Sequence, residues 1–229
     1  MLDNSVVSTE QAKNKGWKTA LLIFSATFAV TLGYAFLRYN VVRNVSYENI
    51  PLFIANKAIA LTATILIGLS FLLGPLARFL PKLFVPHLYL RKHLGVTGFA
   101  AAALHALISL VLLTPAYYPK FFLPNGKMNL IGESSILFGI LAFLIFLAIS
   151  ITSLPPIENR MDPRQWKFVQ RLGYLAYILI LFHVAVMGWA GWWQPESWKF
   201  GLASISLISA LVIVFVLIMR AIVIVFPKK

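Results

Sequence analysis

Six long apolar stretches constrain the fold of this chain more than any other feature. A helix needs about 20 mainly apolar residues to cross the hydrocarbon core of a bilayer. The stretches that qualify are residues 19–37, 58–77, 94–116, 134–154, 172–194 and 200–225. Backbone groups inside lipid must be hydrogen-bonded within the protein, so we expect each stretch to form a helix. The sequence therefore predicts an all-α integral membrane protein, a six-transmembrane-helix bundle.

The composition agrees with one membrane unit. Charged residues make up 12% of the chain, whereas a soluble domain carries about 25%. We expect residues 1–18 to be a cytoplasmic N-terminal segment, 19–226 the six-helix domain and 227–229 a cytoplasmic tail. The chain has no cysteine, which excludes disulfides, thiolate-bound zinc, iron–sulfur clusters and covalently attached haem.

The basic residues predict the orientation of the bundle. The face with both termini and the second and fourth loops collects 14 of the 20 Lys and Arg residues, and the opposite face has six. By the positive-inside rule, both termini lie in the cytoplasm. The same rule accounts for the net charge of +13 without a nucleic-acid partner, because no soluble domain carries a basic patch.

Two histidines, His105 and His183, lie deep in the third and fifth stretches. Each comes 11 residues after the first residue of its uncharged span, Leu94 or Leu172, and both spans run in the same direction. At about 1.5 Å per residue, both side chains should lie about 17 Å into a core about 30 Å thick, just past the midplane on the outer side. An ionisable residue at this depth usually faces the bundle interior and serves a function.

A depth-matched histidine pair on neighbouring helices favours one metal centre, with bis-histidine haem as its occupant. Gly98, Ala101 and Ala102 share the face of His105 and would leave room for a flat macrocycle, although helix–helix contact also favours small residues. A zinc or di-iron site would need carboxylates or more histidines at this depth, and the nearest acid, Glu133, lies at the outer end of its span. The alternative is that each histidine makes only an interhelical hydrogen bond.

Two blocks of sequence resemble a known family. The first is residues 69–80 (LSFLLGPLARFL), then 91–96 (RKHLGV) and His105; the second is residues 151–153, a polar loop and 166–183 (WKFVQRLGYLAYILILFH). They resemble the ferric-reductase-like transmembrane domain family, and are most similar to the haem-binding membrane subunit of the bacterial periplasmic methionine sulfoxide reductase system. The family-like core is about residues 58–194. The resemblance implies a six-helix electron carrier of a prokaryotic cytoplasmic (inner) membrane, with His105 and His183 as the iron ligands of haem b.

The chain departs from the family pattern in its inner half. The family commonly has a histidine 13 residues before the fifth-helix ligand, where this chain has Gln170. Two-haem relatives carry a further histidine about 14 residues before the outer one in the third helix, where this chain has Arg91. His93 is 12 residues before His105 and rotated by ~120° around an ideal helix. We therefore expect one haem.

A single outer haem leaves the inner half without an electron carrier. We expect a flavin (FMN or FAD) or a quinone there, held by charge-assisted hydrogen bonds to its phosphates or anionic edge and by Gln170 at its ring. The candidate residues for this second cofactor are Arg91, Lys92, His93, Arg164, Lys167, Gln170 and Arg171. The alternative is that they are ordinary positive-inside charges, with His93 solvated at the headgroups.

The missing motifs bear on the electron donor. The sequence has no G-x-G-x-x-G and no P-loop, so the chain carries no dinucleotide domain of its own. We predict transmembrane electron transfer from a cytoplasmic flavin reductase or the quinone pool to an outer acceptor, such as a periplasmic reductase subunit. A stand-alone reductase of ferric iron or another metal is the alternative of the same fold. The rival from another class is a cofactor-free transporter or proton-conducting channel.

Overall fold

The computed structural model describes the backbone of residues 4–226 and, Ser197 apart, the side chains of residues 14–226. Within this part, six helices are long and apolar enough to span a membrane, and no β-strand forms beyond an isolated bridge between Phe122 and Met128. The long helices are α1 (Asn4–Phe36), α2 (Ala55–Phe79), α4 (Leu90–Val111), α5 (Leu130–Thr152), α7 (Pro163–Trp192) and α8 (Ile205–Val225). The prediction of an all-α six-helix membrane bundle is confirmed.

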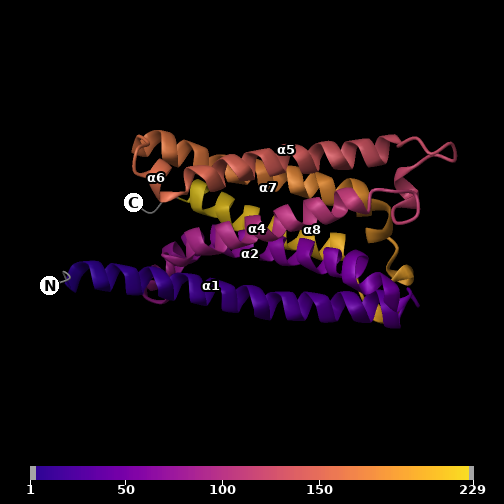
Figure 1. Cartoon of the computed structure of the whole chain (residues 1–229), viewed down its shortest axis with the longest axis horizontal. Helices are drawn as coiled ribbons and strands as arrows, with labels where there is room; N and C mark the ends of the chain where they lie inside the picture. Colours follow the sequence, from indigo (N-terminus) through magenta and orange to yellow (C-terminus); the bar gives the residue numbers. More distant parts are fainter. Residues whose placement is uncertain (1–3, 227–229) are drawn as a thin grey trace.

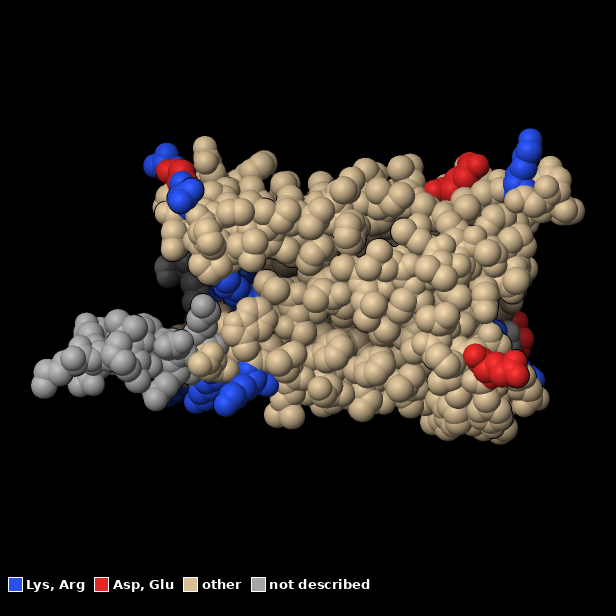
Figure 2. All heavy atoms as spheres, viewed as in Figure 1, with Lys and Arg blue, Asp and Glu red and all other residues tan. Residues whose placement is uncertain are grey.

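Short helical segments join the long helices. They are η1 (Leu37–Val41), η2 (Tyr47–Asn49), η3 (Ile50–Ile54), α3 (Pro81–Phe84), η4 (Val85–His87), η5 (Pro119–Phe121), α6 (Pro155–Glu158), η6 (Pro195–Ser197) and η7 (Lys199–Gly201). α1 begins and α8 ends at one end of the bundle, on the left of Figure 1. We call it the inner end, and the opposite end the outer end. Lys and Arg gather towards the two ends of the molecule in Figure 2, with a largely uncharged surface between them.

Two helix boundaries differ from the apolar stretches for local chemical reasons. α4 ends at Val111 instead of residue 116, because Pro115 has no N–H to donate to a helical turn. α7 begins at Pro163, nine residues before its apolar stretch. The Asp162 side chain accepts from the backbone N–H of Arg164 (2.8 Å) and Gln165 (3.3 Å), which caps the helix. Hydropathy thus detects the lipid-spanning part of a helix and not its polar first turns.

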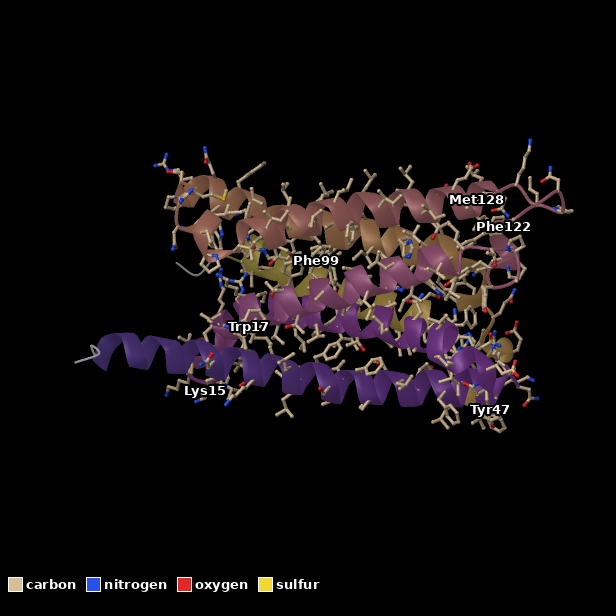
Figure 3. The ribbon with its side chains drawn as sticks, viewed as in Figure 1. Lys15, Trp17, Tyr47, Phe99, Phe122 and Met128 are labelled. Carbon is tan, nitrogen blue, oxygen red and sulfur yellow. The ribbon has the colours of Figure 1, made fainter. Side chains whose placement is uncertain are left out.

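The bundle consists of two closely packed helix pairs. α4 packs along α2, α7 packs along α5, α8 contacts both α2 and α7, and α1 covers α2 and α4. α4 and α5 touch more lightly, through the rings of Phe99 and Phe143 (centroids 5.5 Å apart), and Figure 3 labels Phe99 midway along the bundle. Among the described helices, α4 and α7 are not a packed pair.

A buried tyrosine connects the two pairs. Tyr177 of α7 is fully buried, and its hydroxyl donates to the carbonyl oxygen of Thr64 on α2 (2.8 Å). The hydroxyl reaches α2 because Gly68 has no side chain: a Cβ there would lie 2.7 Å from the tyrosine oxygen. At the inner end, Lys92 of α4 pairs with Glu158 of α6 (2.5 Å). These contacts hold the pairs in register while leaving α4 and α7 apart.

Candidate metal centre

The His105 imidazole is held from α2. Its Nδ1 lies 2.9 Å from Oδ1 of Asn56, a residue that is only 1% exposed. Asn56 Nδ2 donates to Ser109 Oγ (2.9 Å), one turn beyond His105 on α4. This bond turns the amide oxygen of Asn56 to the histidine, and an amide oxygen only accepts. Nδ1 of His105 therefore carries the proton, and Nε2 keeps its lone pair.

The His183 imidazole is held from α5 in the same protonation state. Its Nδ1 donates to the backbone carbonyl oxygen of Ser135 (2.7 Å), and Ser135 Oγ lies 3.2 Å away. The ring comes close to α5 at Gly139, where a Cβ would lie 3.2 Å from Nδ1. A carbonyl oxygen is also only an acceptor, so Nε2 of His183 is again unprotonated.

The two histidines together have the chemistry of a pair of metal ligands. A ligating histidine usually donates its other ring N–H to a carbonyl or carboxylate, which fixes its tautomer and orientation, and both residues do so. The two rings lie close enough for a charge on one to affect the other. Both residues are half-buried, so protein atoms cover them only in part. The arrangement provides two neutral ring nitrogens with free lone pairs, on helices that do not pack on each other.

The ligand count distinguishes between metals. The described residues include no group of three or more His, Cys, Asp or Glu side chains able to hold a metal ion. Zinc and di-iron sites draw at least three protein ligands, whereas haem iron takes four nitrogens from its porphyrin and only axial ligands from the protein. The residues present therefore fit haem better than a bare metal ion.

The small residues near His105 serve helix packing. A Cβ on Gly98 would lie 2.8 Å from Cγ1 of Ile67 and 3.0 Å from its backbone nitrogen. Ala101 is 5% exposed and packs with Ile59 and Ala63 of α2. The sequence left two explanations for these small residues, helix–helix contact and space for a macrocycle. Gly98 and Ala101 serve helix–helix contact.

Sequence reasoning missed the residues that orient the histidines. Asn56 could have been predicted from the sequence. It lies beside Lys57 at the start of a span, and a polar residue at membrane depth needs a partner within the bundle. Nothing in the sequence marks Ser135, because the group that accepts from His183 is a backbone carbonyl, which any residue provides. Gly139 leaves space for the His183 ring because it has no side chain, and the sequence does not show that the two residues are neighbours.

On α4, the candidates for a second cofactor contact other helices. Arg91 Nε donates to the carbonyl of Ser70 on α2 (3.3 Å). His93 packs edge-on against Trp17 of α1 (centroids 4.9 Å apart), and Figure 3 labels Trp17 on the inner part of α1. A Cβ on Gly16 would lie 2.5 Å from the His93 ring. The structure thus places His93 against α1.

On α7, the remaining candidates lie in the first turns. Gln170 Nε2 donates to Ser153 Oγ at the end of α5 (3.1 Å). Arg164, Lys167 and Arg171 are exposed. These residues and Arg91 all lie in the inner parts of their helices, while His93 faces elsewhere. A shared flavin or quinone site among them stays a prediction.

Comparison with known proteins gives the family. The family model described as "Ferric reductase like transmembrane component" matches residues 59–181, more than half of the chain. The chain belongs to this family of transmembrane electron-transfer domains, whose members typically bind haem. The matched range includes His105 and ends two residues before His183. The resemblance found in the sequence is confirmed at the level of the family.

Individual relatives are distant. The chain is 27% identical over 208 residues to Metalloreductase STEAP2 of Homo sapiens, covering 75% of this chain and 42% of the relative, with the same figures for the Mus musculus protein. It is 26% identical over 220 residues to Metalloreductase STEAP3 of Rattus norvegicus, covering 80% and 44%. The chain spans less than half the length of these curated relatives. The narrower similarity to a methionine sulfoxide reductase subunit stays a prediction.

Proposed function

We propose that this protein moves electrons across a membrane through one b-type haem whose axial ligands are His105 and His183. The observation that carries the proposal is the matched pair of imidazoles, each donating through Nδ1 and keeping Nε2 free. Family membership supports it independently. The haem supplies the one-electron redox chemistry, and the protein supplies ligation, orientation and burial.

The positions of the histidines favour an acceptor at the outer end. His105 is six residues before the end of α4 at Val111, and His183 is nine before the end of α7 at Trp192. These separations correspond to about 9 and 14 Å of helix, whereas the inner helix ends are farther away. The electron donor is a cytoplasmic flavin reductase or the quinone pool, and a flavin or quinone relays electrons through the inner half.

Two acceptors fit this direction of transfer. A metal ion, such as ferric iron, is favoured by the relatives, which are named metalloreductases. A periplasmic reductase subunit is the other, on the resemblance to the methionine sulfoxide reductase system. Reduction of an external ferric chelate by vesicles that contain the purified chain and enclose dithionite as the electron donor, without any added subunit, would select the first acceptor. Co-purification of a periplasmic protein that alone accepts the electrons would select the second.

The visible spectrum of the purified protein tests the haem itself. We expect a Soret band that shifts on reduction with dithionite and is lost in His105→Ala and in His183→Ala. His87→Ala is the matched control, because His87 is exposed on η4 and should leave the spectrum unchanged. A folded, colourless protein from cells supplied with haem contradicts the proposal and favours the cofactor-free transporter or channel.

A further inference from the structure

Basic side chains without acidic partners gather at the outer end. Arg38 is 4% exposed, and its Nε has no hydrogen-bond partner. The charges of Arg38 and Arg43 both act on Lys57. In the described part of the chain, the one ion pair is Lys92–Glu158, and it lies at the inner end. A buried charge without a counter-ion is costly, so an anionic partner would stabilise this cluster.

Aromatic rings enclose the ammonium group of Lys57 without neutralising it. Lys57 Nζ lies 4.2 Å from the centroid of the Phe53 ring, 5.1 Å from that of Tyr39 and 5.8 Å from that of Tyr118. Cation–π contacts of this kind stabilise a cation by about 0.5–2 kcal/mol. They hold the ammonium group at one place, and its positive charge remains available to an anion.

Two lysines stand beside the two histidines. Lys57 follows Asn56, the partner of His105, and its charge acts on the His105 imidazole. Lys120, in the loop between α4 and α5, donates from Nζ to the backbone carbonyl of Met187, four residues beyond His183 on α7. Each histidine thus has a lysine on its outer side, one reached from α2 and the other from the outer loop.

The two lysines also affect each other. Partial burial lowers the pKa of Lys120, and the nearby charge of Lys57 lowers it further. Tyr118 lies beside Lys57. Burial raises the pKa of its phenol, while hydrogen bonding to Asn56 and Ser109 lowers it. Two cations and a phenolic hydroxyl therefore lie together on the outer side of the candidate centre.

We propose that Lys57 and Lys120, with the Tyr118 hydroxyl, bind the two propionate carboxylates of the haem. The inference rests on the proposed function. Haem b is an apolar disc with two carboxylates on one edge, and those carboxylates are costly in lipid unless they are paired. The two lysines provide that pairing, so the porphyrin lies with its propionate edge towards the outer end.

Haem with esterified propionates separates this site from the iron ligands. Haem-free wild-type protein is loaded with haem b or with its dimethyl ester, and haem loss to excess apomyoglobin is timed. We expect the ester to leave faster by about 100-fold, because it loses both charge-assisted hydrogen bonds at about tenfold each. Lys57→Met and Lys120→Met, which each remove one of the two, should release haem b about tenfold faster and the ester at the wild-type rate.

Two control variants complete the experiment. Lys127→Met removes the same charge from an exposed position of the outer loop and should change neither rate. Lys57→Arg keeps the charge and should retain most of the preference for haem b. Retention of the ester by every variant shows that the bundle is folded and the histidines ligate.

Other outcomes overturn the proposal. Equal release of haem b by wild type, Lys57→Met and Lys120→Met means that the lysines do not bind the propionates. If the variants change only the binding of free citrate, the lysines serve a carboxylate ligand from outside. Failure of the wild type to take up either haem is a different result, because it contradicts the proposed function itself.

Discussion

At the scale of single residues, the two candidate ligands depend on partners of different kinds. His105 donates to a side-chain amide, that of Asn56, whereas His183 donates to a backbone carbonyl, that of Ser135. Substitution can remove the first acceptor but leaves the second in place. The two imidazoles can therefore be perturbed separately.

Asn56→Leu should weaken haem binding by about 10–100-fold, the usual cost of losing the partner of a ligating histidine. Without its acceptor, the His105 imidazole is a less basic ligand, so the midpoint potential should rise. Asn56→Asp accepts more strongly and should lower it. Redox titration of the Soret band measures both effects. Asn159→Leu makes the same change at an exposed position and is the control. An Asn56→Leu protein with wild-type affinity and potential contradicts this role of Asn56.

At the scale of helices, contact between α2 and α4 sets the position of His105. Gly98 allows the close approach of α4 to Ile67 on α2, and Asn56 reaches His105 across the same contact. Protein interiors are close-packed, so an added methyl group here has to move a helix or a side chain. The packing of α2 against α4 therefore affects the position of His105 directly.

Gly98→Ala should destabilise the bundle by about 1–3 kcal/mol, the usual cost of overpacking. The new Cβ would lie 3.0 Å from the backbone nitrogen of Ile67, which yields less easily than a side chain. Gly33→Ala on α1 is the matched control, since a Cβ there meets nothing within 4 Å. Thermal unfolding in detergent compares the two. Equal melting temperatures for both variants would show that the contact tolerates a methyl group.

At the scale of the whole molecule, the ends of the bundle determine how it sits in a membrane. α1 begins and α8 ends at the same end (Figure 1), as six spans require. The wide uncharged surface between the ends (Figure 2) is suited to lipid. The positive-inside rule assigns the end with the termini to the cytoplasm, and this orientation remains a prediction.

Single cysteines test the orientation, because the natural chain contains none. Lys127→Cys, in the outer loop, should react with a membrane-impermeant maleimide added to intact cells. Arg164→Cys, in the exposed first turn of α7, should react only after the membrane is permeabilised. The reverse pattern would place the termini outside and invert the proposed direction of electron transfer.

The sequence alone was sufficient to predict the spans, and it marked the histidine pair as a candidate site. Lipid offers the backbone no hydrogen-bond partners, so an apolar stretch of sufficient length has to be helical, whatever surrounds it. The cost of an ionisable group in lipid likewise marks His105 and His183. Helical periodicity gives the angle between His93 and His105, but it does not say which neighbouring helix lies on either side.

The tertiary structure decided the partners. Asn56 is 49 residues from His105 in the chain, and Ser135 is 48 from His183. It also decided that Gly98 packs on α2, that His93 faces α1, and that α4 and α7 remain apart. Hydropathy and spacing are properties of one segment at a time. The contacts that orient a ligand depend on how separate helices pack. That packing is determined jointly by side chains that are distant in sequence.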